Sequence, residues 1–433
     1  TNTGTTNIAS TGNITSLTGE GIDALSFDGD ISISSNGNID AFSSDGIRAE
    51  TQFNGNISVT STGDIYAFND GIDVDTNIGT ATVNSSGNIT AIFADGINAY
   101  TVDGDITITS TGNVTSYFAD GIDATTSDDD NITINSSGNI SAYGYGIITN
   151  TPTGTTTITS TGDITSYFED GIRSTSTTGD ITVNSSGNIT ADDEGIDVDT
   201  TSGNVAITST GDITSFVGDG IQADSVTGTV SVSSNGNVTG FVDGIDAYSL
   251  TGNVTVTSTG DVTGQNGDGI QADSVSGAVS VSSKGNVTGY NEGIDAYSFS
   301  GNVTVASTGD VTGQNGDGIQ ADSDTGAVSV SSNGDVTGFI DGIDAYSRTN
   351  SVTVNSTGNV TGQNGNGILA NSQYGTVAVT SNGDVSGLID GIDAYSQTNP
   401  VSVTSTGDVT GTTGEGIDAS SLYGTVSVTS NGN

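Results

Sequence analysis

The chain of 433 residues contains no Cys, Met, Trp or His. These absences exclude disulfides, thiol chemistry and imidazole bases, and they remove the usual ligands of zinc and haem. Lys and Arg together number 4 against 51 Asp and Glu, so the formal net charge is -47. A charge of this sign excludes nucleic acid and anionic membrane surfaces as electrostatic partners and favours cations. No apolar run approaches the length of a membrane span.

What the sequence does contain is a repeat, because Gly-Ile recurs at intervals of 24 or 25 residues from Gly21 to Gly416. A fixed period in this range is typical of a solenoid, in which each unit buries its apolar side against its neighbours. Within one repeat, the segments 254–257, 261–263 and 270–273 alternate apolar and polar residues between glycine-rich turns, which is the pattern of short strands. We therefore expect an all-β, right-handed parallel β-solenoid (β-helix) with three short strands in each of about 17 coils.

The domain organisation follows from the same periodicity. No linker or shift in composition interrupts residues 1–433, so we expect a single continuous solenoid. Residues 1–219 consist mostly of 25-residue coils, and residues 220–433 alternate coils of 25 and 24 residues in a 49-residue double repeat. At about 4.8 Å per coil, the stack would be a rod on the order of 80 Å long. Both ends fall inside the repeat, so we interpret the sequence as a fragment whose open ends permit self-association end to end or into a filament.

The residue before Gly-Ile forms an acidic column, with Tyr145 and Asn366 as its exceptions. Stacked carboxylates suit Ca²⁺, a hard cation that prefers oxygen ligands. The alternative is that each acid only favours the local turn geometry, in which case no cofactor is required. The candidate metal ligands in the second half of the chain are Asp219, Asp243, Asp268, Glu292, Asp317 and Asp341.

The residue after Gly-Ile follows a different rule in the second half of the chain. Gln222 and Gln271 alternate there with Asp246 and Asp295. Two carboxylates one coil apart would repel each other, so alternation lowers an electrostatic cost that a continuous ladder would multiply.

Aromatic residues also recur three or four places before the Gly of Gly-Ile. We interpret them as a stacked corner of the core, with a sugar-binding platform as the alternative. The phenylalanines in this position are Phe42, Phe68, Phe93, Phe118, Phe168, Phe216 and Phe241.

The sequence gives less support to two further functions, ice binding and polysaccharide cleavage. Outward Thr pairs such as Thr107 and Thr109 are similar to the arrays of ice-binding solenoids, but Asn84 and Ala306 interrupt them. A polysaccharide hydrolase or lyase on a solenoid needs one site that differs from its surroundings, whereas every acid here has a copy one or two coils away. We therefore predict that the chain is not an enzyme.

The repeats 258–264 (Ser-Thr-Gly-Asp-Val-Thr-Gly) and 252–258 (Gly-Asn-Val-Thr-Val-Thr-Ser) resemble the β-helical passenger regions of bacterial autotransporters and filamentous-haemagglutinin-like adhesins. The resemblance is one of repeat style, and it identifies no catalytic or receptor-binding residue. It implies a secreted rod that is extracellular or attached to the cell surface, and it leaves any cell-surface or glycan receptor unknown. We expect a structural or adhesive stalk or matrix fibre, with a calcium-braced adhesin as the alternative.

Overall fold

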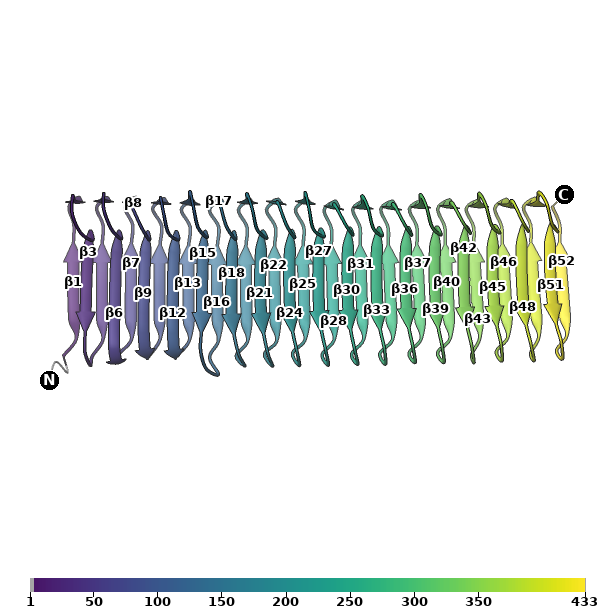
Figure 1. Cartoon of the computed structure of the whole chain (residues 1–433), viewed down its shortest axis with the longest axis horizontal. Coiled ribbons are helices and arrows are strands. Elements are labelled where there is room, and N and C mark those ends of the chain that lie inside the picture. The colour runs from purple at the N-terminus through teal and green to yellow at the C-terminus, as the bar shows by residue number, and fades with distance from the viewer. Residues whose placement is uncertain (1–3, 433) are drawn as a thin grey trace. The chain divides into compact units, whose positions relative to one another are not determined.

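The computed structural model describes residues 4–432 as an all-β solenoid with three parallel strands in each coil and about 17 coils (Figure 1). This confirms the all-β solenoid expected from the repeat. Contacts within the chain divide it into two compact units, Thr1–Phe216 and Val217–Asn433. The boundary lies close to position 220, where the 49-residue double repeat begins. Among the described residues, no helix is long and apolar enough to cross a bilayer.

The first unit contains β1 to β26. The first strands of its coils are β1 Thr6–Ser10, β4 Ile31–Ser35, β7 Ile57–Ser61, β10 Ala81–Ser85, β13 Ile106–Ser110, β16 Ile132–Ser136, β19 Thr156–Ser160, β22 Ile181–Ser185 and β25 Val205–Ser209. The second strands are β2 Ile14–Ser16, β5 Ile39–Ala41, β8 Ile65–Ala67, β11 Ile89–Ala91, β14 Val114–Ser116, β17 Ile140–Ala142, β20 Ile164–Ser166, β23 Ile189–Ala191 and β26 Ile213–Ser215. The third strands are β3 Ile22–Ser26, β6 Ile47–Asn54, β9 Ile72–Ile78, β12 Ile97–Asp103, β15 Ile122–Thr126, β18 Ile147–Thr151, β21 Ile172–Ser176 and β24 Ile196–Thr200.

The second unit contains β27 to β52. Its first strands are β28 Val230–Ser234, β31 Val254–Ser258, β34 Val279–Ser283, β37 Val303–Ser307, β40 Val328–Ser332, β43 Val352–Ser356, β46 Val377–Ser381, β49 Val401–Ser405 and β52 Val426–Ser430. Its second strands are β29 Val238–Gly240, β32 Val262–Gly264, β35 Val287–Gly289, β38 Val311–Gly313, β41 Val336–Gly338, β44 Val360–Gly362, β47 Val385–Gly387 and β50 Val409–Gly411. Its third strands are β27 Ile221–Ser225, β30 Ile245–Ser249, β33 Ile270–Ser274, β36 Ile294–Ser298, β39 Ile319–Ser323, β42 Ile343–Ser347, β45 Ile368–Ser372, β48 Ile392–Ser396 and β51 Ile417–Ser421.

Strands of the same kind pair in parallel from one coil to the next. In the second unit β31 pairs with β34, so that Val254 lies beside Val279. On the third-strand side β33 pairs with β36, and Ile270 lies beside Ile294. Because the pairing shift equals one repeat, each residue stacks on its own equivalent, and a periodic sequence becomes a set of columns.

The core is a thin column of aliphatic side chains inside the coils. Val254, Val262 and Ile270 point inward from the three strands of one coil and are fully buried. Each such side chain contributes about 1.5–3 kcal/mol of burial energy. A glycine at the corner before the third strand lets the coils approach closely, because a Cβ on Gly269 would lie 2.4 Å from Val287 Cγ1 and 2.5 Å from the Gly293 carbonyl oxygen.

A second corner, before the second strand, carries a ladder of Asn and Asp side chains. The Asn237 side-chain oxygen accepts a hydrogen bond of 3.0 Å from the backbone N–H of Asp261, and the Asp261 carboxylate accepts one of 2.8 Å from Asn286. Asn286 in turn accepts one from Asp310 at 3.0 Å. An amide and a carboxylate serve equally as acceptors, so alternating them keeps the ladder while separating like charges.

The aromatic residues do not form a corner of the core, contrary to the interpretation from the sequence. Phe68, Phe93, Phe118 and Phe168 are between 41% and 58% exposed. They do stack from coil to coil, with ring centroids 4.7 Å apart for Phe68 and Phe93 and 5.2 Å apart for Phe93 and Phe118. The core does not need them because Ile, Val and Ala already fill the inside of each coil.

The outward face of the first strands is built from small polar residues. Thr107 and Thr109 on β13 lie beside Thr82 and Asn84 on β10, and Asn135 follows on the other side of Thr109. The column through Thr109 therefore alternates hydroxyl and amide groups rather than presenting a uniform Thr array.

Candidate metal centre

The acidic column lies at the corner where the chain enters each third strand. Asp219, Asp243, Asp317 and Asp341 are all more than nine-tenths buried there. The glycine that follows each of them makes this close packing feasible, since a Cβ on Gly220 would lie 2.6 Å from the Gly244 carbonyl oxygen. The Asp-Gly-Ile sequence thus places a carboxylate beside the backbone of the next coil.

Each aspartate in this column accepts a backbone hydrogen bond from the residue at the same position one coil later. The Asp219 Oδ1 atom accepts from the N–H of Asp243 at 2.7 Å, and Asp268 accepts from Glu292 at 2.9 Å. The exception Asn366 does the same, because its Oδ1 atom accepts from Asp390 at 3.0 Å. In the first unit, Asp70 and Asp95 accept from the next coil at 2.8 and 2.9 Å. The acidic residues therefore do stabilise the turn, and they do so through a ladder of hydrogen bonds between successive coils.

Carboxylates of this column also gather in clusters, in four cases with the residue after Gly-Ile and in one case with Asp193. In five places three carboxylate groups offer one oxygen each within 4.8 Å of one another. These clusters are Asp45, Asp70 and Asp73; Asp95, Asp120 and Asp123; Asp170, Asp193 and Glu194; Asp219, Asp243 and Asp246; and Asp317, Asp341 and Asp344.

The clusters include four of the six ligands predicted from the sequence. Asp219 and Asp243 converge with Asp246, and Asp317 and Asp341 converge with Asp344. Asp268 and Glu292 belong to none of the clusters found among residues 4–432.

Asp246 and Asp344 are not among the ligands predicted from the sequence, although Asp246 belongs to the alternating column described there. Their column and the acidic column are three residues apart, and the turn of the chain into the third strand brings the two together. A signal was present in the spacing, because Asp-Gly-Ile-Asp repeats at 243–246 and 341–344 in the coils that complete a cluster.

The electrostatics of the clusters favour neutralisation. Burial raises the pKa of Asp246 to about 8, with further contributions from Asp224, Asp219 and Asp243. Burial likewise raises the pKa of Asp344 to about 8, with contributions from Asp322, Asp317 and Asp341. Carboxylates crowded in this way resist ionisation, so either protons or a bound cation would relieve their repulsion.

Two of the five clusters already contain a basic side chain. The Arg173 guanidinium lies 3.5 Å from Asp170 and 3.2 Å from Asp197. The Arg48 Nε atom lies 3.6 Å from Asp73. Of the remaining basic residues, Arg348 pairs with Asp324 at 3.3 Å, and Lys284 follows the first strand β34. The chain thus places half of its four basic residues at these carboxylates.

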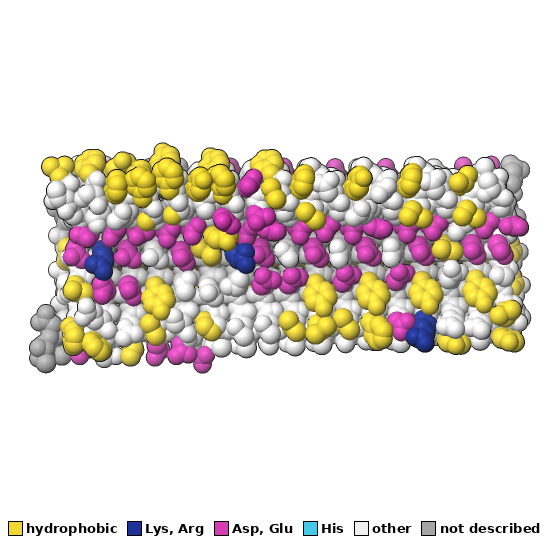
Figure 2. All heavy atoms as spheres, in the orientation of Figure 1, with side chains coloured by type: hydrophobic (Ala, Val, Ile, Leu, Met, Phe, Trp, Pro, Cys, Tyr) yellow, Lys and Arg dark blue, Asp and Glu magenta, His cyan; other side chains and the backbone are white. Residues whose placement is uncertain are grey.

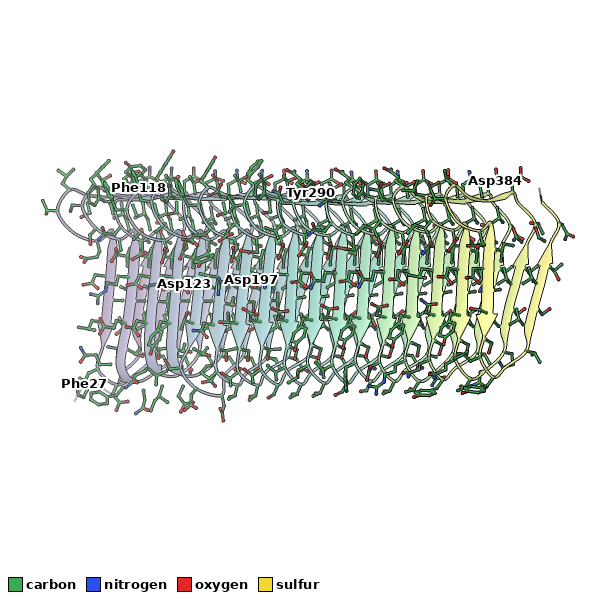
Figure 3. The ribbon with its side chains drawn as sticks, turned by 45° about the vertical axis from the view of Figure 1, so that its right-hand side comes forward. Phe27, Phe118, Asp123, Asp197, Tyr290 and Asp384 are labelled. Carbon is green, nitrogen blue, oxygen red and sulfur yellow. The ribbon has the colours of Figure 1, made fainter. Side chains whose placement is uncertain are left out.

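The other three clusters suit a hard divalent cation. Their donors are carboxylate oxygens alone, which Ca²⁺ prefers, and each cluster draws on two adjacent coils. Three carboxylates leave the rest of a six- to eight-oxygen shell to water. Figure 3 shows Asp123, a member of one of these clusters, on the third-strand face of the first unit, with Phe118 at the neighbouring corner.

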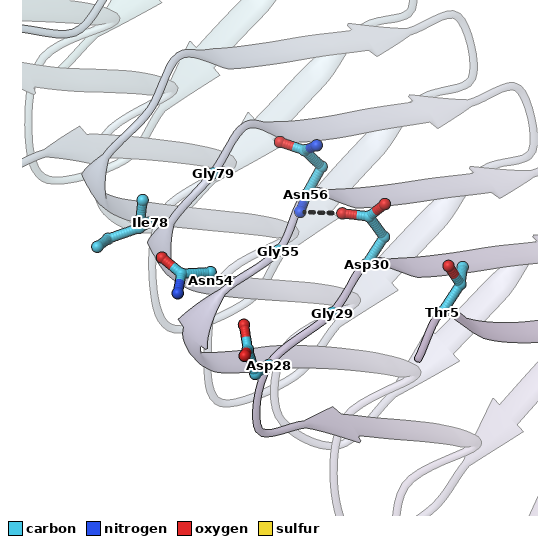
Figure 4. A pocket seen from close by; sticks show the side chains of 9 residues that line it. All are labelled: Thr5, Asp28, Gly29, Asp30, Asn54, Gly55, Asn56, Ile78 and Gly79. Carbon is cyan, nitrogen blue, oxygen red and sulfur yellow. Dashed lines mark hydrogen bonds between the residues drawn. The ribbon is translucent and has the colours of Figure 1, made fainter. Parts of the chain in front are cut away.

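A groove of about 440 Å³ lies at another corner of the first unit, where the chain passes from each third strand to the next first strand (Figure 4). Its floor is the backbone of Gly29, Gly55 and Gly79, which have φ of 142°, 153° and 142°. Asp30 on one wall accepts a hydrogen bond of 2.8 Å from the backbone N–H of Asn56. This polar side chain of the groove therefore takes part in a hydrogen-bond ladder between coils and does not form part of a binding site for a single ligand.

Comparison with family models, with curated proteins and with solved structures finds no match for this chain.

Proposed function

We propose that the chain is a structural segment of an extracellular rod, the stalk of a surface adhesin or a fibre of a matrix. The observation that supports this most directly is the ladder between coils: at the corner before the second strand, Asn237, Asp261 and Asn286 each hold the backbone of the next coil. Such bonds run along the stack and reinforce its length, which is what a stalk requires. The resemblance to autotransporter and haemagglutinin-like repeats supports export to the cell surface.

Small-angle X-ray scattering of the whole chain tests the stalk. If the coils of both units continue one stack, the largest dimension will be on the order of 80 Å, from about 4.8 Å per coil. A largest dimension near half that value would mean that the two units fold back on each other, and it would contradict the proposal.

A calcium-braced adhesin is a second candidate, and one observation favours it. Arg173 places a positive charge at a cluster of the same kind, 3.5 Å from its member Asp170 and 3.2 Å from the neighbouring Asp197. We propose that Ca²⁺ takes the corresponding role at the clusters of Asp123, Asp246 and Asp344. A cation that binds only the folded chain stabilises it by about 2.7 kcal/mol when present at a hundred times its dissociation constant.

The calcium candidate is tested by thermal unfolding in millimolar Ca²⁺ and in EDTA at matched ionic strength. The double variant Asp243→Asn/Asp246→Asn replaces two carboxyl groups of one cluster by amides and leaves an amide oxygen to accept the ladder bond. Its control, Asp261→Asn/Asp310→Asn, makes the same two replacements in an exposed ladder that already contains Asn237 and Asn286. The calcium-dependent rise in melting temperature should shrink in the first variant and persist in the control. An equal rise in both would mean that calcium acts only as a diffuse counterion.

A further inference from the structure

The first unit carries an uninterrupted stack of aromatic rings on its surface. The stack consists of Phe68, Phe93, Phe118, Tyr143 and Phe168, one ring from each of five successive coils. Neighbouring ring centroids are 4.7, 5.2, 6.0 and 4.2 Å apart along this order. Every ring is between 39% and 58% exposed. A contiguous apolar surface of this kind marks an interaction site more often than it stabilises a fold.

The fold does not need aromatic residues at this corner. In alternate coils of the second unit the same corner is built from Gln-Asn-Gly, as at 265–267, while the coils between them carry Phe241, Tyr290 and Phe339 there. Asn266 donates its backbone N–H to the Phe241 carbonyl at 2.9 Å. In the stack, Phe93 donates its backbone N–H to the Phe68 carbonyl at the same distance of 2.9 Å. Because the same backbone hydrogen bond forms when the corner residue is polar, the exposed rings are not required for the structure of the corner.

The orientation of the rings limits what can bind them. Phe93 and Phe118 are nearly parallel, with an interplanar angle of 7°, so each covers a face of the other. A sugar ring stacks on an open aromatic face, which is not offered between these two rings, while the other three neighbouring pairs are tilted by 51°, 43° and 30°. The exposed ring edges instead suit aliphatic side chains or the faces of a partner's aromatic rings.

Charge limits the partner further. Asp95 and Asp120 lie two residues after Phe93 and Phe118, and both are only half-buried. Figure 2 shows a band of acidic side chains running beside a row of hydrophobic ones. With a net charge of -47 the chain repels anionic surfaces, so the complementary partner is cationic.

The protein contains an internal example of this recognition. The guanidinium carbon of Arg173 lies 5.9 Å from the centre of the Tyr145 ring, while its Nη1 atom is 3.5 Å from Asp170 of the acidic column. Tyr145 belongs to the coil of Tyr143 in the stack. One arginine thus contacts an aromatic ring and the acidic column at the same time.

We propose that the aromatic stack docks a cationic amphipathic protein segment, whose apolar side chains contact the ring edges and whose Arg or Lys side chains pair with the adjacent carboxylates. This inference goes beyond the stalk, because the surface would bind such a segment whether or not the chain is part of a rod.

The test measures binding of a fluorescent helical peptide of Leu and Arg to the whole chain, in EDTA so that divalent cations do not compete. The stack variant replaces 92–94 and 117–119 by Gln-Asn-Gly, the sequence that forms this corner at 265–267. The control variant, Phe27→Asn/Phe53→Asn, removes two exposed rings with centroids 4.5 Å apart at a different corner. Affinity should fall by about tenfold or more in the stack variant and change little in the control. Circular dichroism verifies the fold, and the single variant Phe118→Gln replaces the stack variant if that one does not fold.

Two further probes decide what is recognised. A peptide of equal charge with Ser in place of Leu should bind much more weakly than the amphipathic peptide. Equal binding of both peptides, unaffected by the stack variant, would reduce the interaction to charge alone and overturn the proposal. Binding of a neutral soluble glucan that the stack variant abolishes would also overturn it, in favour of a sugar-binding surface.

Discussion

The Asp317 Oδ1 atom accepts a hydrogen bond of 2.7 Å from the backbone N–H of Asp341, which occupies the same position one coil later. Both residues are 7% exposed, so the bond is shielded from water. An acidic residue here has two opposite effects on stability. Its oxygen stabilises the fold by accepting a hydrogen bond from a buried donor, and its negative charge destabilises the fold by repelling the nearby carboxylates. Separating the two effects by substitution is the most direct check on the role of the column.

The variant Asp317→Ala should lower stability by about 1–3 kcal/mol, because the N–H of Asp341 loses its partner in a buried position. The variant Asp317→Asn should cost much less, since an amide oxygen replaces the carboxylate, as Asn366 does naturally with Asp390. Hydrogen exchange at the amide of residue 341 provides the measurement, with faster exchange expected only in the Ala variant. Similar exchange rates in the two variants would show that the ladder bond contributes little.

Stability should decrease as pH rises from about 4 to about 8 in the absence of divalent cations. Burial raises the pKa of Asp295 to about 8, followed by the effects of Asp273 and Glu292. The folded state therefore binds this proton more tightly than the unfolded state does, so the stabilisation is complete below pH 4 and disappears as pH passes the folded pKa. Asp246 and Asp344 shift in the same direction.

Urea unfolding midpoints measured in EDTA between pH 4.5 and 9 check this dependence. The variant Asp295→Asn should flatten the curve, because it removes one of the titrating groups. A midpoint that rises with pH would contradict the assignment of buried, protonated carboxylates.

Calcium should compensate in part for the loss of the positive charge of Arg173. Its guanidinium contacts Asp170, which is 1% exposed, and the buried Asp197, so Arg173→Gln leaves buried charge uncompensated. The expected loss is about 1–3 kcal/mol, and millimolar Ca²⁺ should restore part of it. The control is Arg348→Gln, which breaks an exposed pair with Asp324 and should change stability by at most about 1 kcal/mol. Denaturant midpoints with and without Ca²⁺ distinguish the two variants.

The corner glycines should differ sharply in their tolerance of a methyl group. A Cβ on Gly269 would lie 2.4 Å from Val287 Cγ1 and 2.5 Å from the Gly293 carbonyl oxygen, so Gly269→Ala should destabilise by about 3 kcal/mol or more. At Gly19 the nearest neighbour, Ser16 Oγ, would be 3.9 Å away, and Gly19→Ala should be nearly neutral. Thermal melting of both variants compares them, and equal melting temperatures would mean that the coils separate easily.

The periodicity of the sequence was sufficient to predict the strands. A repeat of 24 or 25 residues in which Val254, Val256 and Ile270 alternate with polar residues can bury its apolar side only by stacking as short strands on the neighbouring repeats. The aromatic residues were interpreted wrongly for a related reason. A recurring Phe93 or Phe118 follows the same period whether it points into the coil or out of it, and the period alone does not distinguish the two.

The sequence by itself determined the all-β solenoid, the three strands of each coil and the acidic column that includes Asp219 and Asp341. Only the tertiary structure decided what the column does, since the hydrogen bond from Asp341 to Asp317 joins residues 24 positions apart through the stacking of coils. The same holds for the meeting of Asp243 with Asp246 and for the exposure of Phe118. Each depends on the direction in which a side chain leaves a turn, which is set by the packing of neighbouring coils and is not contained in the spacing of residues along the chain.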